Sequence, residues 1–383
     1  MIEQRNGSGF STTCVHAGAR PDQHTGGIVT PILPSTAHRF PNPSGENLYP
    51  RYFNIPNITA VSAKIAALER AEAALVVSSG MAAVSTCLLG LLRAGDHVLF
   101  HSELYGGTLH LAKETLPRFG IEVDFYDLQG DDFMTRVRPN TRMIYAETPS
   151  NPLLKVTDLR RVAHFARSRG IVTLVDNTFA SPINQRPVEH GFDLVLHSGT
   201  KYLNGHSDVC CGAIAGRAEL VDRIRSAAVD HGGVLDARAC WLLERGLKTL
   251  ALRIQRHNEN GQRIAEFLRG HPRVSAVHYP GLTDDPGHGI ARRQMDGFGG
   301  MLSFEVKGAV ADAERFVSRL RLFTLAISLG GVESLVCFPC RTSHAHVGAG
   351  ERARMGVTDN LLRMSVGIED AIDLMADLKQ ALE

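Results

Sequence analysis

The sequence predicts an α/β protein with a mainly parallel central sheet, followed by a smaller α+β domain. Between about residues 60 and 245, short runs rich in β-branched residues alternate with segments whose apolar residues recur every three or four positions. Such alternation is typical of a parallel sheet that helices cover on both faces. The length of 383 residues favours two domains over one.

The elements follow in order along the chain. Residues 1–60 are rich in Pro, Gly, Asn and Thr, which predicts an extended arm rather than packed helices. In the large domain, residues 61–245, the predicted strands are ALVVSS (74–79), HVLFHS (97–102), VDFYD (123–127), RMIYAE (142–147), IVTLVDN (171–177), DLVLHS (193–198) and CGAIAG (211–216). One or two long helices over residues 237–270 lead into the smaller domain, residues 246–383. Its predicted elements are strands at 301–308 and 362–370 and helices at 311–320 and 373–383.

The composition favours a small-molecule partner. Forty-one basic and forty acidic side chains leave a net charge of +1, which gives no electrostatic footprint for nucleic acid or an anionic membrane. The start of the chain has no secretory signal pattern, and the longest apolar stretch is too short to span a bilayer. We therefore expect a soluble, cytoplasmic protein.

Cysteine and histidine motifs do not predict a metal site. The seven cysteines are scattered and odd in number, which disfavours a disulfide framework. Cys337 and Cys340 have CxxC spacing, but no second CxxC or nearby His pair completes a zinc site. His344 and His346, in the tripeptide HAH, fit a polar loop.

Polar residues directly follow most of the predicted strands of the large domain. Because ligands of open α/β sheets gather outside the carboxyl ends of the strands, we expect these residues to share one site. They are Ser78–Met81, Tyr105 with the two glycines after it, Asn151, Asp176–Thr178 and Ser198–Lys201.

This set contains a phosphate cup, an acid, an aromatic ring and a lysine, which are the groups that pyridoxal phosphate requires. A lysine amine bonds to the cofactor's aldehyde, a carboxylate keeps the pyridine nitrogen protonated, and backbone and hydroxyl donors hold the phosphate. Taken singly, each residue also fits an ordinary turn, a helix cap or a solvated side chain. No GxxxxGK, GxSxG or HExxH motif favours another chemistry.

With these residues in place, the sequence resembles the Cys/Met-metabolism family of pyridoxal-phosphate enzymes. This family includes cystathionine γ-synthase, cystathionine γ-lyase, cystathionine β-lyase and methionine γ-lyase. The likeness runs nearly end to end and implies the fold type I of pyridoxal-phosphate transferases. The matching stretches are YPR, SSGMAA, LYGGT, ETPSNP, VDNTF, HSGTKYLNGHSD, RGLKTLALR, RRQMDGFGGMLSFEV, SLGGVESL and LLRMSVGIED.

The resemblance implies a role for each candidate residue. Lys201 would carry the cofactor and move protons, Asp176 would pair with the pyridinium, and Tyr105 would stack on the ring and act near the leaving group. The phosphate would be held by the Gly80 and Met81 backbone, by the Ser198 and Thr200 hydroxyls, and by Tyr49 and Arg51 of a neighbouring subunit. Asn151 would contact the ring hydroxyl of the cofactor. Arg363, with Ser328, would hold the substrate carboxylate. Family members are typically homotetramers made of two active dimers.

Departures from the family pattern bear on the reaction. The arm stretch YPRYFNIPN has one residue more than the usual pattern before the next helix. Ile327 stands where cystathionine-handling members often carry an acid, which favours an uncharged thioether such as methionine. Gly107 stands where methionine γ-lyases often have cysteine, which points the other way.

The leading hypothesis is a γ-eliminating C–S lyase that acts on methionine or cystathionine and releases a thiol, a 2-oxo acid and ammonia. The alternative is a γ-replacing synthase of the cystathionine γ-synthase or O-acylhomoserine sulfhydrylase type, which would use the same residues. A third hypothesis is an α/β binding module without cofactor, in which the strand-end residues are only turns.

Overall fold

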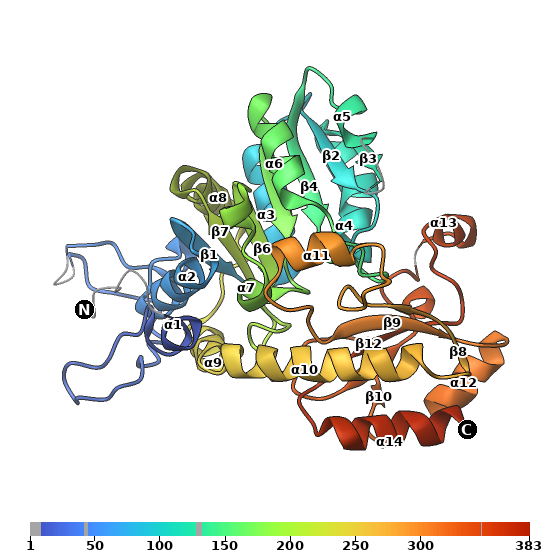
Figure 1. Cartoon of the computed structure of the whole chain (residues 1–383). Coiled ribbons are helices and arrows are strands. Elements are labelled where there is room, and N and C mark those ends of the chain that lie inside the picture. Colours follow the sequence, from blue (N-terminus) through green and yellow to red (C-terminus); the bar gives the residue numbers. More distant parts are fainter. Residues whose placement is uncertain (1–8, 42–44, 128–131, 346) are drawn as a thin grey trace.

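The structure, a computed structural model, describes residues 9–41, 45–127, 132–345 and 347–383. Its strands form two sheets, one built from residues 73–216 and one from residues 274–365, which Figure 1 shows in different parts of the molecule. Within the described residues, none of the helices combines the length and apolar character needed to cross a membrane.

The first sheet has seven strands in the order β1-β7-β6-β5-β4-β2-β3. Strand β7 is antiparallel to both of its neighbours, and the other pairs are parallel. All seven strands predicted from the sequence are confirmed: β1 (Ala73–Val77), β2 (His97–His101), β3 (Glu122–Tyr126), β4 (Thr141–Glu147), β5 (Val172–Asp176), β6 (Leu194–Ser198) and β7 (Gly212–Gly216).

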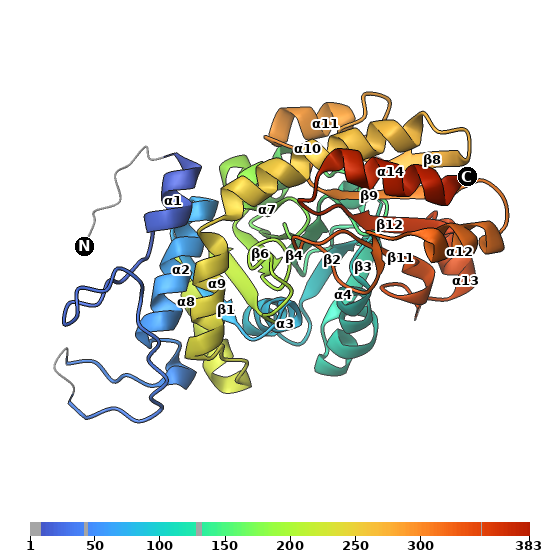
Figure 2. The ribbon, with the colours of Figure 1, turned by 90° about the horizontal axis from the view of Figure 1, so that it is seen from below.

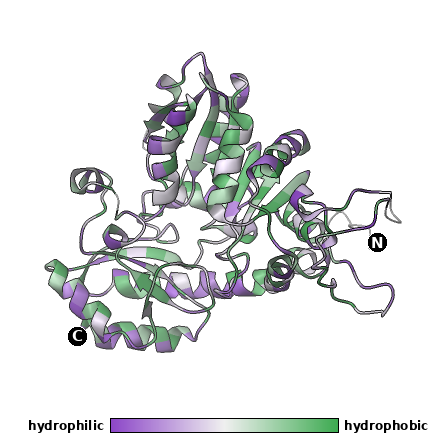
Figure 3. Cartoon of the chain, turned by 180° about the vertical axis from the view of Figure 1, so that it is seen from behind, coloured by the Kyte–Doolittle hydropathy of each residue, from purple (hydrophilic) through white to green (hydrophobic). Residues whose placement is uncertain are grey.

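Helices cover both faces of this sheet, as the alternation predicted. Successive side chains of a strand point to opposite faces, so Met143 and Tyr145 of β4 enter one core while Ile144 and Ala146 enter another. Helices α3 (Gly80–Leu91) and α8 (Ala218–His231) cover the first face, and α6 (Leu159–Ser168) covers the second. Helix α2 (Pro56–Glu69) lies on the second face, because its Glu69 contacts His197 of β6 (2.5 Å), which points to the same side as Val195. Figure 3 shows the hydrophobic strands enclosed between helices with hydrophilic outer faces.

The second sheet has five strands in the order β10-β11-β12-β9-β8. Its strands are β8 (Val274–His278), β9 (Met301–Val306), β10 (Thr324–Leu325), β11 (Leu335–Cys337) and β12 (Leu361–Ser365). Helices α12 (Val310–Arg319) and α14 (Ala371–Leu382) pack with it around a separate core. The predicted strands β9 and β12 and both helices are confirmed, whereas β8, β10 and β11 carried too weak a pattern to be predicted.

The long helical stretch between the sheets folds as two helices, α9 (Ala237–Leu247) and α10 (Leu250–Arg269). Figures 1 and 2 show α9 beside the first sheet and α10 running on beneath the second. The other α-helices are short: α1 (Phe10–His16), α4 (Gly106–His110), α5 (Asp132–Thr135), α7 (Ser181–Asn184), α11 (His288–Gln294) and α13 (Ala349–Arg354). The domain boundaries at residues 60 and 245 stay a prediction.

The described part of the N-terminal arm contains short helices that the composition did not predict, α1 and a 3-10 helix over Pro50–Tyr52. A buried lysine of α2 fixes the end of α1, because Lys64 Nζ donates to the carbonyl oxygens of Cys14 (2.8 Å) and Val15 (3.3 Å). Such a cation at a helix C-terminus satisfies carbonyl groups that lack partners within the helix. Further along, Phe53 takes up a left-handed conformation (φ 57°) before α2 begins.

Candidate active site

The carboxyl ends of β4, β5 and β6 lie side by side. Glu147 pairs with Asp176 in the sheet register, and Asp176 pairs with Leu196, two residues before Ser198. The polar residues that follow these strands are therefore brought to one edge of the sheet, as the sequence predicted.

Asp176 is held by the threonine two residues after it. Its Oδ1 accepts hydrogen bonds from the Thr178 amide (2.9 Å) and hydroxyl (2.5 Å), and the Thr178 hydroxyl oxygen accepts from the Ser198 amide (2.8 Å). Burial raises the pKa of Asp176, and the Thr178 bonds and the nearby His197 oppose that shift. Among the described residues nothing donates to Oδ2. A protonated pyridine nitrogen would fit this oxygen, since a cation lowers the cost of a buried carboxylate.

Lys201 lies in the turn that follows β6, and its side chain reaches toward the second sheet. Its Nζ donates to Ser328 Oγ (2.8 Å), and its amide donates to the Ser198 carbonyl oxygen (3.2 Å). Burial, with the positive charge of Arg363 as the next cause, lowers the pKa of Lys201 to about 8. A lysine so placed is neutral more often than a solvated one, which suits attack on an aldehyde.

This pKa predicts how capture of pyridoxal phosphate by cofactor-free enzyme depends on pH. Only the neutral amine attacks, and its fraction rises as the pH rises through the pKa. At pH 7.5 about a quarter of Lys201 is neutral, against about one in a thousand for a lysine of pKa 10.5. We expect the growth of visible absorbance after mixing to be half-maximal near pH 8. A rate that keeps climbing toward pH 10 would contradict the lowered pKa.

Arg253 holds the turn that carries Lys201, a role that the sequence did not reveal. Its buried guanidinium, which comes from α10, donates to the carbonyl oxygens of Tyr202 (2.8 Å), Leu203 (3.3 Å) and Gly246 (2.9 Å). Gly205 follows with φ +75°, and a Cβ there would lie 2.0 Å from Arg253 Nη1. The arginine thus replaces the water that these buried carbonyl groups would otherwise need.

Arg363, the residue predicted to hold the substrate carboxylate, lies close to two other predicted site residues, Asn151 and Ser328. Arg363 comes from β12 and is buried, with Nη1 donating to Asn151 Oδ1 (2.9 Å) and Nη2 to the Ser328 carbonyl oxygen (3.4 Å). Ser328 has φ +102°, a strained conformation for a residue with a side chain, and the same residue receives the Lys201 bond. The amine and the guanidinium therefore meet at one serine, and a guanidinium suits a carboxylate there.

Tyr105 lies at the start of α4, and the residue is 45% exposed. Its amide donates to Glu147 Oε2 (2.8 Å). Close backbone packing requires Gly106, because a Cβ there would lie 1.9 Å from the Ser343 carbonyl oxygen. A Cβ on Gly107 would lie 2.6 Å from the Tyr105 ring, so a larger residue there would require the tyrosine side chain to move. A cysteine at position 107 would contact the Tyr105 ring, whereas Gly107 leaves that space free.

The predicted phosphate cup lies between the N-terminus of α3 and the end of β6. A Cβ on Gly80 would lie 2.8 Å from the Ser198 Cβ, so only glycine allows this approach. Ser79 caps α3 by accepting from the Ala82 amide (3.0 Å), which leaves the amides of Gly80 and Met81 for a phosphate. The Thr200 hydroxyl contacts the Cys211 backbone (3.0 and 3.2 Å) in this structure. These residues fit a phosphate. To bind it, the Thr200 hydroxyl would exchange its hydrogen bond to the Cys211 carbonyl oxygen for one to the phosphate.

Tyr49 and Arg51 lie on the N-terminal arm, where the Arg51 guanidinium is 5.9 Å from the centre of the Tyr49 ring. Both are exposed, and Arg51 Nη1 donates to the Val229 carbonyl oxygen (3.0 Å) at the end of α8.

The CxxC and HAH motifs are not part of the strand-end site. Cys337 and Cys340 are buried free thiols, and the described residues contain no cluster of metal-ligating side chains. His344 is buried, and His346 lies outside the described residues.

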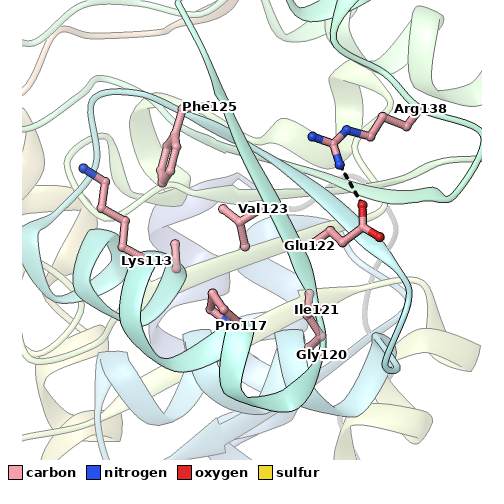
Figure 4. Close-up of a pocket in the computed structure, with 9 residues that line it drawn as sticks. Lys113, Pro117, Gly120, Ile121, Glu122, Val123, Phe125 and Arg138 are labelled. Carbon is pink, nitrogen blue, oxygen red and sulfur yellow. Dashed lines mark hydrogen bonds and ion pairs between the residues drawn. The ribbon is translucent and has the colours of Figure 1, made fainter.

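A separate pocket of about 600 Å³ lies at the β3 edge of the first sheet (Figure 4). Lys113, Phe125 and Arg138 are among its lining residues, and Arg138 donates to Glu122 Oε2 (2.6 Å). No residue of the predicted site lines it. The pocket is therefore separate from the strand-end residues.

Together the fold and the strand-end site place the chain in the class of fold type I pyridoxal-phosphate enzymes. The chain belongs to the Cys/Met metabolism PLP-dependent enzyme family, whose profile matches residues 11–383. Its cofactor is accordingly pyridoxal phosphate.

Three similar proteins illustrate the range of the family. Cystathionine gamma-lyase of Bacillus subtilis is 44% identical over 377 residues, covering 97% of this chain and 98% of that protein. L-methionine gamma-lyase of Pseudomonas putida is 42% identical over 390 residues, covering 98% and 97%. The crystal structure of cystathionine gamma-lyase from Lactobacillus plantarum complexed with L-serine superposes with a TM-score of 0.94 at 38% identity, covering 98% of both chains.

Proposed function

We propose that this protein is a γ-eliminating carbon–sulfur lyase that acts on methionine or another uncharged thioether amino acid. The observation that carries the proposal is that Lys201 and Arg363 both donate hydrogen bonds to Ser328. An amino acid whose carboxylate binds Arg363 has its α-carbon close to the lysine amine. The relatives named as cystathionine and methionine γ-lyases support the same reaction class.

The protein residues then divide the work. Arg363, with Asn151 and Ser328, holds the α-carboxylate, and Lys201 removes the α-proton and then a β-proton. Bound pyridoxal phosphate supplies the electron sink, which Asp176 maintains by keeping the ring nitrogen protonated. Tyr105 gives a proton to the leaving sulfur. Thiol, 2-oxo acid and ammonia are the products after hydrolysis.

The substrate preference rests on Ile327, which is 77% exposed and directly precedes Ser328. An acidic residue there would pair with the distal ammonium of cystathionine. Isoleucine offers apolar surface instead, which suits the methyl thioether of methionine.

A substrate panel on the holoenzyme tests this proposal. Methionine, cystathionine, homocysteine, cysteine and O-acylhomoserine with and without thiol would be compared by kcat/KM and by product. Cysteine with 2-oxobutanoate from cystathionine marks γ-cleavage, whereas homocysteine with pyruvate marks β-cleavage. The proposal fails if O-acylhomoserine with a thiol reacts far faster than methionine or cystathionine alone, since that result defines a γ-replacing synthase.

The Ile327→Glu variant sharpens the test of substrate preference. An exposed ion pair contributes less than about 1 kcal/mol, so the preference for cystathionine over methionine should rise about two- to fivefold. Ile372→Glu adds the same charge at another exposed isoleucine, on α14, and should leave the ratio unchanged. An unchanged ratio in Ile327→Glu would remove Ile327 from the specificity argument.

We further propose that the enzyme is a homotetramer of two active dimers in which Tyr49 and Arg51 complete a neighbouring copy's phosphate site. The arm that carries them exposes large apolar side chains, including Ile28 and Phe40. A pocket of about 400 Å³ beside the phosphate cup, lined by Ser78 and Cys210 among others, could receive them. The mass in solution, measured by sedimentation, tests the tetramer.

A cytoplasmic location is part of the same proposal. All seven cysteines are free, which suits a reducing compartment. Fractionation of cells, followed by detection of the protein, tests the location.

A further inference from the structure

Glu147, the last residue of β4, is a buried carboxylate to which the reaction proposed above assigns no role. Its Oε2 accepts from the Tyr105 amide (2.8 Å), and its Oε1 accepts from the Asn151 amide (3.1 Å). Tyr105 lies at the start of α4, after β2, and Asn151 lies in the loop after β4 itself. One side chain therefore joins two segments that approach the site from different strands.

Burying an ionised carboxylate at position 147 costs free energy. Burial raises the pKa of Glu147 well above its usual range, and the neighbouring Asp176 raises it further, while the two amide donors oppose the shift. An apolar residue would avoid this cost but would leave two buried amides without an acceptor. A glutamine would offer an acceptor to one amide and place an N–H donor against the other. Only an acid of this length supplies two acceptors here.

The Asn151 contact extends from Glu147 to the second sheet. The Asn151 side chain accepts from Arg363 of β12, so the position of the Asn151 backbone also sets the position of the guanidinium's partner. Glu147 also accepts from the Tyr105 amide, so it positions the segment that carries the Tyr105 ring. A displacement of this carboxylate would change the position of both segments together.

We propose that Glu147 is a positioning residue whose two oxygens set the Tyr105 backbone and the Asn151–Arg363 pair in their places around the bound cofactor and amino acid. This inference rests on the proposed function only in that Tyr105 and Arg363 face the cofactor and the substrate carboxylate. It does not depend on which carbon–sulfur bond is cleaved.

The experiment compares Glu147→Gln with Glu103→Gln in the holoenzyme. Glu103 is also buried and accepts from Ser150 Oγ (3.0 Å) and from Lys155, but it contacts neither amide. Glycine is the probe, titrated through the change it causes in the visible absorbance of the bound cofactor. Because glycine has no sulfur and no side chain to lose, its affinity reports on the carboxylate site without any turnover.

We expect Glu147→Gln to retain its cofactor and to bind glycine about tenfold or more weakly, which corresponds to leaving one buried amide without its acceptor. Glu103→Gln should stay within about twofold of wild type. In a Tyr105→Phe background, Glu147→Gln should reduce kcat for the thioether substrate by a smaller factor than in wild type. A general loss of stability would lower the melting temperature but would not produce this dependence on Tyr105.

Three results would overturn the proposal. Wild-type glycine affinity in Glu147→Gln would show that the amides find their places without the second acceptor. An equal loss in Glu103→Gln would show a general loosening of the loop. If Glu147→Gln does not fold, Glu147→Asp keeps the charge but is one methylene shorter, and wild-type glycine affinity in that variant would overturn the proposal as well. A failure of the lyase proposal appears in the substrate panel and leaves the glycine titration interpretable.

Discussion

Replacing Lys201 by alanine should remove the visible absorbance of the holoenzyme and reduce turnover by at least about a thousandfold. The side chain is the proposed covalent anchor of the cofactor and the proposed base, and general acid–base catalysis alone contributes about a hundred- to ten-thousandfold. Absorbance spectra of the purified variant and kcat/KM for its best substrate would measure both effects.

Lys201→Arg is the matched control for this variant. The guanidinium keeps a positive charge beside Ser328 but is never neutral at ordinary pH, so it can neither bond to the aldehyde nor act as a base. We expect it to be as inactive as the alanine variant. An alanine variant that keeps the visible absorbance or wild-type activity would remove Lys201 from both proposed roles.

Arg51→Ala should lose most activity alone and regain part of it when mixed with Lys201→Ala chains. If Arg51 reaches a neighbour's phosphate, a mixed dimer contains one site with an intact lysine from one chain and an intact Arg51 from the other. The lost charge-assisted bond should weaken cofactor binding about ten- to a hundredfold. Activity would be measured after the two inactive variants are unfolded and refolded together.

Arg39→Ala, another exposed arginine of the arm, is the control for this experiment and should keep full activity. If the mixture of Arg51→Ala and Lys201→Ala stays as inactive as its components, Arg51 does not serve a neighbouring site. Full activity in Arg51→Ala alone would lead to the same conclusion.

Local pattern predicted most of the first sheet. The β-branched runs that end in Asp176 and Ser198 identified their strands, because a strand buried on both faces leaves a clear apolar run. The same runs located the site, since parallel strands place their carboxyl ends at one edge. Strand β8, the short strands β10 and β11 and helix α1 were missed because they are stabilised by packing against other elements more than by their own sequence.

The candidate site could be predicted where its residues lie in strand-end motifs. Lys201, Asp176, Asn151 and Tyr105 are of this kind. Arg253 and Glu147 were missed because their roles depend on backbone partners that only the folded chain brings near. Arg253 binds carbonyl groups about fifty residues away, and no spacing rule connects a guanidinium to a carbonyl oxygen at that distance in sequence.

The bonds that join Lys201 to Ser328 and Arg363 to Asn151 each link the part of the chain that carries the first sheet to the part that carries the second. An amino acid that binds between these groups contacts both parts at once. By thermodynamic linkage, such a ligand stabilises the contact between them by the same free energy that the contact contributes to its affinity. Substitutions at the junction of the two parts, distant from the lysine, can therefore change KM while leaving every residue of the site in place.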